Sequence, residues 1–202
     1  MTIAWEHGLI RAGGESPCGG RVIKFGGSLL RRGGWPAALR ALVVGRVVAP
    51  TTIVVGGGSL VDGLRAIDAA HPLPAALSHR LAIDAMGLTA RLVADATGFP
   101  LTAEPAAGAA VVVLDTPSWL AVGTRLTDLP VGWHVTSDSI AAAVAAACDA
   151  ALWLAKSEPP PTGELECLAR AGWVDDYFTL AAAPLSRIEW AAPATAAPSA
   201  SA

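Results

Sequence analysis

Cysteine is scarce in this chain of 202 residues. The three cysteines, Cys18, Cys148 and Cys167, include no C-x-x-C pair, so neither a disulfide framework nor a zinc site is predicted. The four histidines include no H-x-x-x-H pair, and an isolated histidine is more often a structural or surface residue than a ligand. We therefore expect no metal to be held by these side chains.

An excess of positive charge is also missing. The chain has 14 Lys and Arg residues against 17 Asp and Glu residues, which gives a net charge of −3 and a pI near 5.7. Binding to nucleic acid or to an acidic membrane surface would require a basic field. We therefore expect neither nucleic acid nor membrane among the partners.

Long hydrophobic runs are absent as well. The longest apolar stretch, from Ile140 to Ala155, is interrupted by Asp149 and falls short of the roughly 20 residues that a membrane span needs. The N-terminal sequence lacks the basic and apolar segments of a secretion signal. The expected location is the cytoplasm.

The standard nucleotide-binding motifs are missing. No G-x-x-x-x-G-K-[ST] occurs in the chain, and no G-x-G-x-x-G follows a predicted strand. Lysine is nearly missing too, because only Lys24 and Lys156 of the 14 basic residues are lysines. A compact ammonium group on a flexible stem can contact a phosphate in a narrow site where a guanidinium group is too wide, so these two residues are candidates for a specific role.

What the sequence does contain is a regular alternation of apolar runs and helical patterns. The runs are apolar throughout rather than at every second residue, which is typical of buried parallel strands. This favours an α/β fold, a three-layer α/β/α sandwich with a mostly parallel open sheet. The predicted strands are Val22–Phe25, Thr51–Val55, Ala110–Asp115 and Ala151–Ala155. The predicted helices are one that begins at Trp35 and is stopped by Pro50, one from Ser59, Ala75–Thr97 and Ser139–Cys148.

Two local features refine the helix predictions. Ser59 with Asp62 three residues later is a capping-box pattern. In the long helix Ala75–Thr97, four leucines fall on one face at helical spacing, namely Leu77, Leu81, Leu88 and Leu92.

The composition favours one domain. We expect an N-terminal extension over residues 1–20, a single domain over 21–190, and a disordered low-complexity tail over 191–202. A homo-oligomer is also expected from the apolar composition.

Glycines follow two of the predicted strands. Gly26-Gly27 and Gly56-Gly57-Gly58 each leave backbone N–H groups unshielded beside a helix N-terminus, where phosphate binds readily. A single glycine pair is more often a tight turn than a binding site, but two such turns favour phosphate binding.

Charged residues stand close to these turns. Lys24 and Lys156 both lie at the end of an apolar strand. Asp138 falls in the first turn of a predicted helix, where capping alone would explain a carboxylate. A carboxylate between the two lysines would also hold both ammonium groups in place, and the two interpretations are compatible.

Three motifs together resemble the successive signatures of the amino-acid kinase superfamily. They are KFGGSLL at Lys24–Leu30, VVGGGSLVDGLR at Val54–Arg65 and VTSDSIAAAVAAACDAALWLAKS at Val135–Ser157, in the family's order. The resemblance covers most of residues 21–157. It implies ATP-dependent phosphoryl transfer, a reaction that depends on alignment and on charge neutralisation.

The family pattern also implies roles for single residues. Lys24, Asp138 and Lys156 would be the catalytic residues, with Asp138 orienting the two lysines. Nucleotide and phosphate binding would fall to Gly26, Gly27, Ser28, Lys156 and Ser157. The acceptor would contact Gly56, Gly57, Gly58 and Ser59, and also Thr136 and Ser137, which turn chemistry explains equally well. The implied cofactors are ATP and Mg²⁺, and the implied partner is a small phosphate acceptor.

A narrower resemblance concerns the substrate. The TSDSIAA turn, the GWVDDYF segment at Gly172–Phe178 and the helix around His79 are similar to the small kinases of methanofuran biosynthesis. This implies phosphorylation of aminomethylfuran-methyl phosphate to its diphosphate. The alternatives are a uridylate kinase, an acyl-phosphate-forming kinase, and a catalytically weak relative that binds a nucleotide or anion. The last is motivated by Ser157–Gly163, where the family usually has a Val-Asp-Gly loop.

Overall fold

The structure, a computed structural model, describes residues 4–13, 17, 19–44, 50–122, 125 and 129–194. In the described part, one open seven-stranded sheet has the order β1-β7-β6-β2-β3-β5-β4. Its neighbouring strands pair in parallel except β1 and β7, which are antiparallel. The predicted fold class is therefore confirmed. The strands are β1 (Trp5–Ala12), β2 (Arg21–Phe25), β3 (Thr51–Val55), β4 (Leu101–Thr102), β5 (Val111–Leu114), β6 (Ala151–Ala155) and β7 (Arg187–Pro193).

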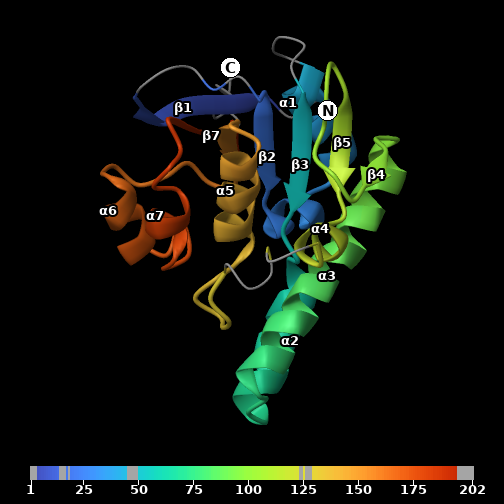
Figure 1. The fold of residues 1–202 in the computed structure, drawn as a ribbon, viewed down its shortest axis with the longest axis vertical. Coiled ribbons are helices and arrows are strands. Elements are labelled where there is room, and N and C mark those ends of the chain that lie inside the picture. The colour runs from blue at the N-terminus through green and yellow to red at the C-terminus, as the bar shows by residue number, and fades with distance from the viewer. Residues whose placement is uncertain are drawn as a thin grey trace, which may run out of the picture.

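Helices cover both faces of this sheet and complete the three-layer sandwich (Figure 1). The helices are α1 (Trp35–Val44), α2 (Ser59–Ala70), α3 (Ala75–Thr97), α4 (Thr116–Leu120), α5 (Ser137–Ala147), α6 (Leu165–Arg170) and α7 (Phe178–Ala181), and a 3-10 helix, η1 (Gly27–Arg31), follows β2. Over the described residues, none of the helices combines the length and the apolar character that crossing a membrane requires.

Two hydrophobic clusters lie on opposite sides of the sheet, because successive residues of a strand point to opposite faces. Val22 packs in the cluster that contains Ile140 of α5, whereas Ile23 packs in the cluster that contains Leu39 of α1. Lys24 comes two residues after Val22 and therefore points to the α5 side. Lys156 comes two residues after Leu154, which belongs to the α5-side cluster as well.

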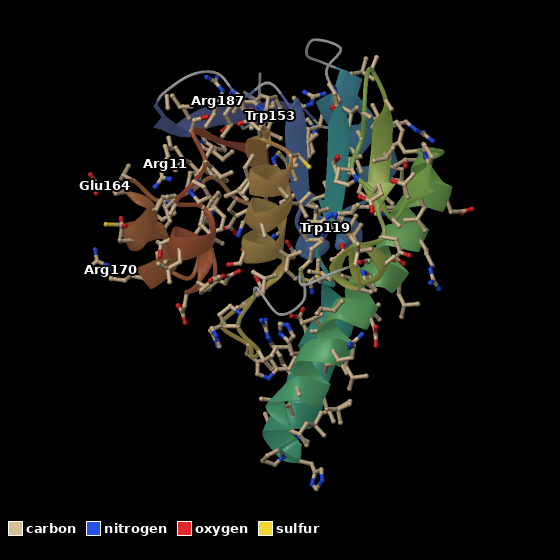
Figure 2. All side chains as sticks on the ribbon, in the orientation of Figure 1. Arg11, Trp119, Trp153, Glu164, Arg170 and Arg187 are labelled. Carbon is tan, nitrogen blue, oxygen red and sulfur yellow. The ribbon has the colours of Figure 1, made fainter. Side chains whose placement is uncertain are left out.

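The ends of the described chain form one edge of the sheet. β1 pairs with β7 from Trp5↔Pro193 to Ala12↔Arg187, and Trp153 of β6 makes an edge-to-face contact with His7 of β1. Arg187 and Trp153 both lie beside β1 in Figure 2.

Residues from both predicted flanking segments contribute to this edge of the sheet. The predicted N-terminal extension contributes a strand to the sheet. Ala191 and Ala192, which we assigned to a disordered tail, are fully buried in β7, a strand that lies between β1 and β6 in the sheet. Residues 195–202 lie outside the described residues.

Helices α2 and α3 run side by side and project beyond the end of the sheet as an arm (Figure 1). The bounds of α3 agree with the prediction, but its leucine face is the solvent side: Leu77, Leu88 and Leu92 are 45%, 56% and 52% exposed. Helix α3 instead packs through Ala90 and Val93, which are fully buried.

Two helix starts differ from the prediction. Gly58 is the N-cap of α2 and no side chain caps this helix, so Ser59 is the first helical residue and the predicted capping box does not form. Helix α5 begins at Ser137, two residues earlier than expected, because the Thr136 side chain caps it by accepting a bond from the Asp138 N–H. Val47, which we placed on the apolar face of the first helix, lies outside the described residues.

Candidate active site

Three parallel strands bring the predicted site residues together. Lys24 is in register with Val54 of β3 and Leu154 of β6. The glycines after β3 and Lys156 after β6 therefore emerge at the same edge of the sheet as Lys24. Ligands in open α/β sheets bind beyond this carboxyl edge, so the register explains why distant motifs share one site.

Asp138 joins the two lysines. Lys24 Nζ forms an ion pair with Asp138 Oδ1 at 2.9 Å, and Lys156 Nζ contacts Asp138 Oδ2 at 2.8 Å. Lys24 is 6% exposed and Asp138 is 5% exposed. One buried carboxylate thus holds two ammonium groups through its two oxygens, which is the arrangement that the sequence predicted for these three residues.

The charges of this group depend on one another. Burial alone would raise the pKa of Asp138, but Lys24 and Lys156 outweigh it and the pKa is lowered. Burial, together with repulsion from Lys24, lowers the pKa of Lys156 to about 8, although Asp138 and Asp175 oppose the change. Asp138 is therefore ionised at neutral pH. Lys156 is mostly protonated at pH 7 and loses its proton near pH 8.

The two glycine turns pack directly against each other. A Cβ atom on Gly27 would lie 2.2 Å from the Gly58 backbone nitrogen. Gly58 has a φ of +54°, and a Cβ atom there would lie 2.7 Å from the Gly27 carbonyl oxygen. Only glycine allows this contact. The two turns that the sequence predicted to bind phosphate are therefore parts of one surface.

A first cavity of about 200 Å³ opens on the α5 side of these turns. It is lined by Lys24 and Asp138, by the turn residues Gly27 and Ser28, and by further predicted residues, namely Gly56, Gly57, Gly58, Thr136 and Ser137. Ser59, which we predicted to contact the acceptor, is the first residue of α2 and does not line this cavity.

The far end of the first cavity lies between α2, α3 and the chain before α5. There the Trp133 indole N–H donates to Asp68 at 2.7 Å, and the Arg65 guanidinium lies over the Trp133 ring, 5.1 Å from its centroid. Ile83 and Met86 line the stretch of wall along α3. This end of the cavity is thus partly apolar and partly polar.

His79 also lines the first cavity and is buried. Its Nδ1 lies 3.3 Å from the Gly132 carbonyl oxygen, and its Nε2 has no hydrogen-bond partner among the described residues. Burial lowers the pKa of His79, with smaller contributions from His134 and Arg80, while the contact with Gly132 opposes them. His79 therefore presents a neutral imidazole at neutral pH.

A second cavity, of about 330 Å³, lies on the other side of Gly27. Its lining includes Lys156, Glu158 and Trp173, together with the predicted residues Lys24, Gly26, Gly27, Ser28 and Ser157. Ser28 and Ser157 join its two sides through a hydrogen bond of 2.6 Å between their hydroxyl groups. Both cavities therefore share Lys24, Gly27 and Ser28.

Two further residues support the site but were not among the predicted ones. Asp175 accepts hydrogen bonds from the backbone and side chains of Thr136 and Ser139 at the start of α5. The Trp173 carbonyl accepts a bond from Lys156 Nζ, whose ammonium lies 4.7 Å from the centroid of the Trp173 ring. The sequence shows only an acidic pair within GWVDDYF, and no local pattern links it to α5.

The side chains of the second cavity fit the phosphates of ATP. Lys24 and Lys156 supply positive charge and Gly27 supplies a backbone N–H group, which are the kinds of group that hold phosphate, whereas the Gly26 N–H donates to the Ala155 carbonyl. Among the described residues, no group of three or more His, Cys, Asp or Glu side chains could hold a metal ion. Magnesium bound with nucleotides often keeps several waters and is held largely by the phosphates, so Mg²⁺ would reach this site together with ATP.

Comparison with known proteins supports the fold. No protein family matches the sequence, and no curated protein matches it. Among solved structures, the chain is similar to the uridylate kinase from Archaeoglobus fulgidus, with a TM-score of 0.57 and 18% sequence identity over 87% of this chain and 91% of that one. At this identity the likeness establishes a shared fold, which extends over nearly the whole of both chains.

Proposed function

We propose that the protein is an ATP-dependent phosphotransferase that acts on a small phosphate monoester. The observation that carries the proposal is that two cavities meet at Lys24, Gly27 and Ser28, with the Lys24–Asp138–Lys156 group beside them. A donor phosphate in the second cavity and an acceptor in the first would face each other across this turn. The similarity to a uridylate kinase supports the same conclusion.

The chain would act by alignment and by charge. Lys24, placed where both cavities meet, would neutralise the charge on the oxygens of the phosphate being transferred, and electrostatic stabilisation of this kind usually contributes most to the acceleration of such reactions. Lys156 would hold the donor phosphates in the second cavity. Asp138 would keep both ammonium groups charged and oriented. The N–H groups of Gly26 and Gly56 donate to the Ala155 and Phe25 carbonyls, so the backbone N–H groups of the other turn glycines would bind phosphate oxygens.

For the acceptor we propose aminomethylfuran-methyl phosphate. The first cavity has Lys24 and the glycine turns at one end and, farther along, an apolar wall with polar residues beyond it. That layout suits a small ring between a phosphate and a polar group. The uridylate and carboxylate acceptors of related kinases are the alternatives that the experiment must separate.

Two measurements test this proposal. A ligand present at 100 times its dissociation constant stabilises a protein by roughly 2.7 kcal/mol, so Mg-ATP should raise the melting temperature clearly. Incubation with Mg-ATP and aminomethylfuran-methyl phosphate, UMP, N-acetylglutamate or aspartate should then yield ADP and a new diphosphate with the first of these.

Two results count against the proposal in different ways. An acyl phosphate or UDP as the main product would refute the proposed acceptor but keep the phosphotransferase. Binding of Mg-ATP without product from any acceptor would favour the catalytically weak relative.

A further inference from the structure

A short segment after α6 contacts two elements of the site at once. Trp173 lies against Lys156, and Asp175 lies against the start of α5, the helix that carries Asp138. These elements are separate in the sequence. The segment therefore connects the helix that presents the carboxylate to the lysine that this carboxylate holds.

Asp175 makes an unusually complete set of contacts. Its Oδ2 accepts from the Thr136 N–H at 3.0 Å, from the Thr136 hydroxyl at 2.7 Å and from the Ser139 N–H at 3.1 Å, and its Oδ1 accepts from the Ser139 hydroxyl. Thr136 is the N-cap of α5. Asp175 thus fixes the first turn of α5 on both sides of Asp138 and places a carboxylate at its positive end.

Trp173 fixes the other partner. Its carbonyl oxygen accepts from Lys156 Nζ, and its indole N–H donates to the Glu158 carbonyl at 3.2 Å. The ammonium of Lys156 therefore donates to two partners, the Asp138 carboxylate and the Trp173 carbonyl. The chain that follows Lys156 is attached to the same tryptophan.

Charge gives Asp175 a second effect. The charged groups that act on Lys156 are Lys24 from β2, Asp138 from α5 and Asp175. Without Asp175, the single carboxylate of Asp138 would offset the charges of two ammonium groups. With Asp175, two carboxylates offset the two ammonium groups of Lys24 and Lys156. Because the pKa of Lys156 is about 8, the loss of one nearby carboxylate would change its charge within the physiological range.

We propose that Asp175 is a positioning residue that holds the start of α5 against Lys156 and keeps the Lys156 ammonium charged for binding donor phosphates. The catalytic part of this inference rests on the proposed function, whereas the effect on Lys156 does not. A purely structural cap would stabilise α5 but leave the proton equilibrium of Lys156 unchanged. The two roles can therefore be distinguished by titration.

The composition makes this titration simple, because Lys24 and Lys156 are the only lysines in the chain. Protein labelled with ¹³C at the lysine Cε gives two side-chain signals, which Lys24→Arg and Lys156→Arg variants assign. The pH titration of the Lys156 signal is then compared between the wild type and Asp175→Asn. The matched control is Asp176→Asn, which removes the same charge from the adjacent, exposed position.

We expect Asp175→Asn to shift the Lys156 pKa downward by roughly 0.5 to 1, and Asp176→Asn to leave it near the wild-type value. Asp175→Glu, which keeps the charge, should restore most of the effect. If Asp175→Asn does not fold, Asp175→Gln serves instead, with Asp175→Glu as its charged counterpart, because the Gln amide oxygen can still accept from Thr136. An unchanged Lys156 pKa in the neutral variant, or an equal shift in Asp176→Asn, would overturn the proposal.

Kinetics add a readout for the catalytic part. The high-pH limb of kcat/KM for ATP, measured with aminomethylfuran-methyl phosphate, should move to lower pH in Asp175→Asn and stay in place in Asp176→Asn. If Asp175→Asn lowers the Lys156 pKa but the wild type transfers no phosphate, the charge effect of Asp175 is supported and the proposed function is refuted. Transfer with the same pH profile in both variants would refute the positioning role alone.

Discussion

Lys24 and Asp138 form a buried ion pair of 2.9 Å although they lie far apart in the sequence. Strand β2 delivers the lysine and the first turn of α5 delivers the carboxylate, and both point to the same side of the sheet. The second carboxylate oxygen contacts Lys156. Lys24 of this pair lines both cavities, and Asp138 lines the first.

Asp138→Asn should remove the partner of both ammonium groups. Leaving buried charges without their partner costs about 3 kcal/mol or more, and we expect a loss of that size in the free energy of unfolding, measured in urea at pH 7. The Lys156 pKa should fall below about 8, because in the wild type the Asp138 carboxylate raises it. Phosphoryl transfer should fall by at least about 100-fold. Stability and transfer near the wild-type values would contradict this role of Asp138.

The lowered pKa of Lys156 should make the stability of the protein depend on pH. Its folded pKa of about 8 lies below the unfolded value near 10.4, so between these values the unfolded state binds more protons and stability rises with pH. Below the folded pKa, the buried ammonium destabilises the protein. The free energy of unfolding of the wild type, relative to Lys156→Met, should therefore increase from pH 7.5 to pH 10. Parallel curves for the two proteins would contradict this account.

The contact between the glycine turns predicts a large difference between similar substitutions. Gly58→Ala would force a Cβ atom towards the Gly27 carbonyl at a positive φ, and we expect a loss of about 1 to 3 kcal/mol. The control is Gly63→Ala in α2, where no atom lies within 4 Å of the added carbon. Because Ala favours helix over Gly, Gly63→Ala should stabilise by about 0.5 to 1 kcal/mol. Equal effects in urea denaturation would argue against the turn contact.

The assignment of the first cavity to the acceptor can be tested by filling it. Ala82 lines this cavity from α3 and is partly exposed. Ala82→Leu should raise the KM for the acceptor about tenfold by steric overlap, while the melting-temperature shift caused by Mg-ATP stays the same. Ala76→Leu, on an exposed position of the same helix, should change neither quantity. A weaker response to Mg-ATP in Ala82→Leu would place the nucleotide in the first cavity instead.

Much of the fold could be predicted because its signals are local. Strands β2, β3 and β6 are short apolar runs that end in glycine or lysine, and a parallel sheet brings such ends to one edge. The geometry of Lys24, Asp138 and Lys156 follows from that edge and from the alternation of strand side chains. The resemblance to kinases supplied the roles, which remain predictions.

The features that the sequence did not predict depend on distant contacts. In the sequence, nothing distinguishes Asp175 from a surface acid. Only the fold brings its carboxylate within hydrogen-bond distance of Thr136 and Ser139. Strand β7 is hidden because its last residues, Ala191 to Pro193, read as the start of a low-complexity tail. The leucine face of α3 looked like a core face, yet Ala90 and Val93 pack inside. The homo-oligomer stays a prediction.

The most direct test of the central claim is the transfer of a labelled γ-phosphate from Mg-ATP to aminomethylfuran-methyl phosphate, followed in a single turnover by wild-type protein and by Lys24→Ala. We predict that the wild type forms the labelled diphosphate, and that Lys24→Ala is slower by at least about 1,000-fold although it still unfolds cooperatively in urea. Absence of label in every phosphate and carboxylate acceptor, or transfer by Lys24→Ala at the wild-type rate, would contradict the account.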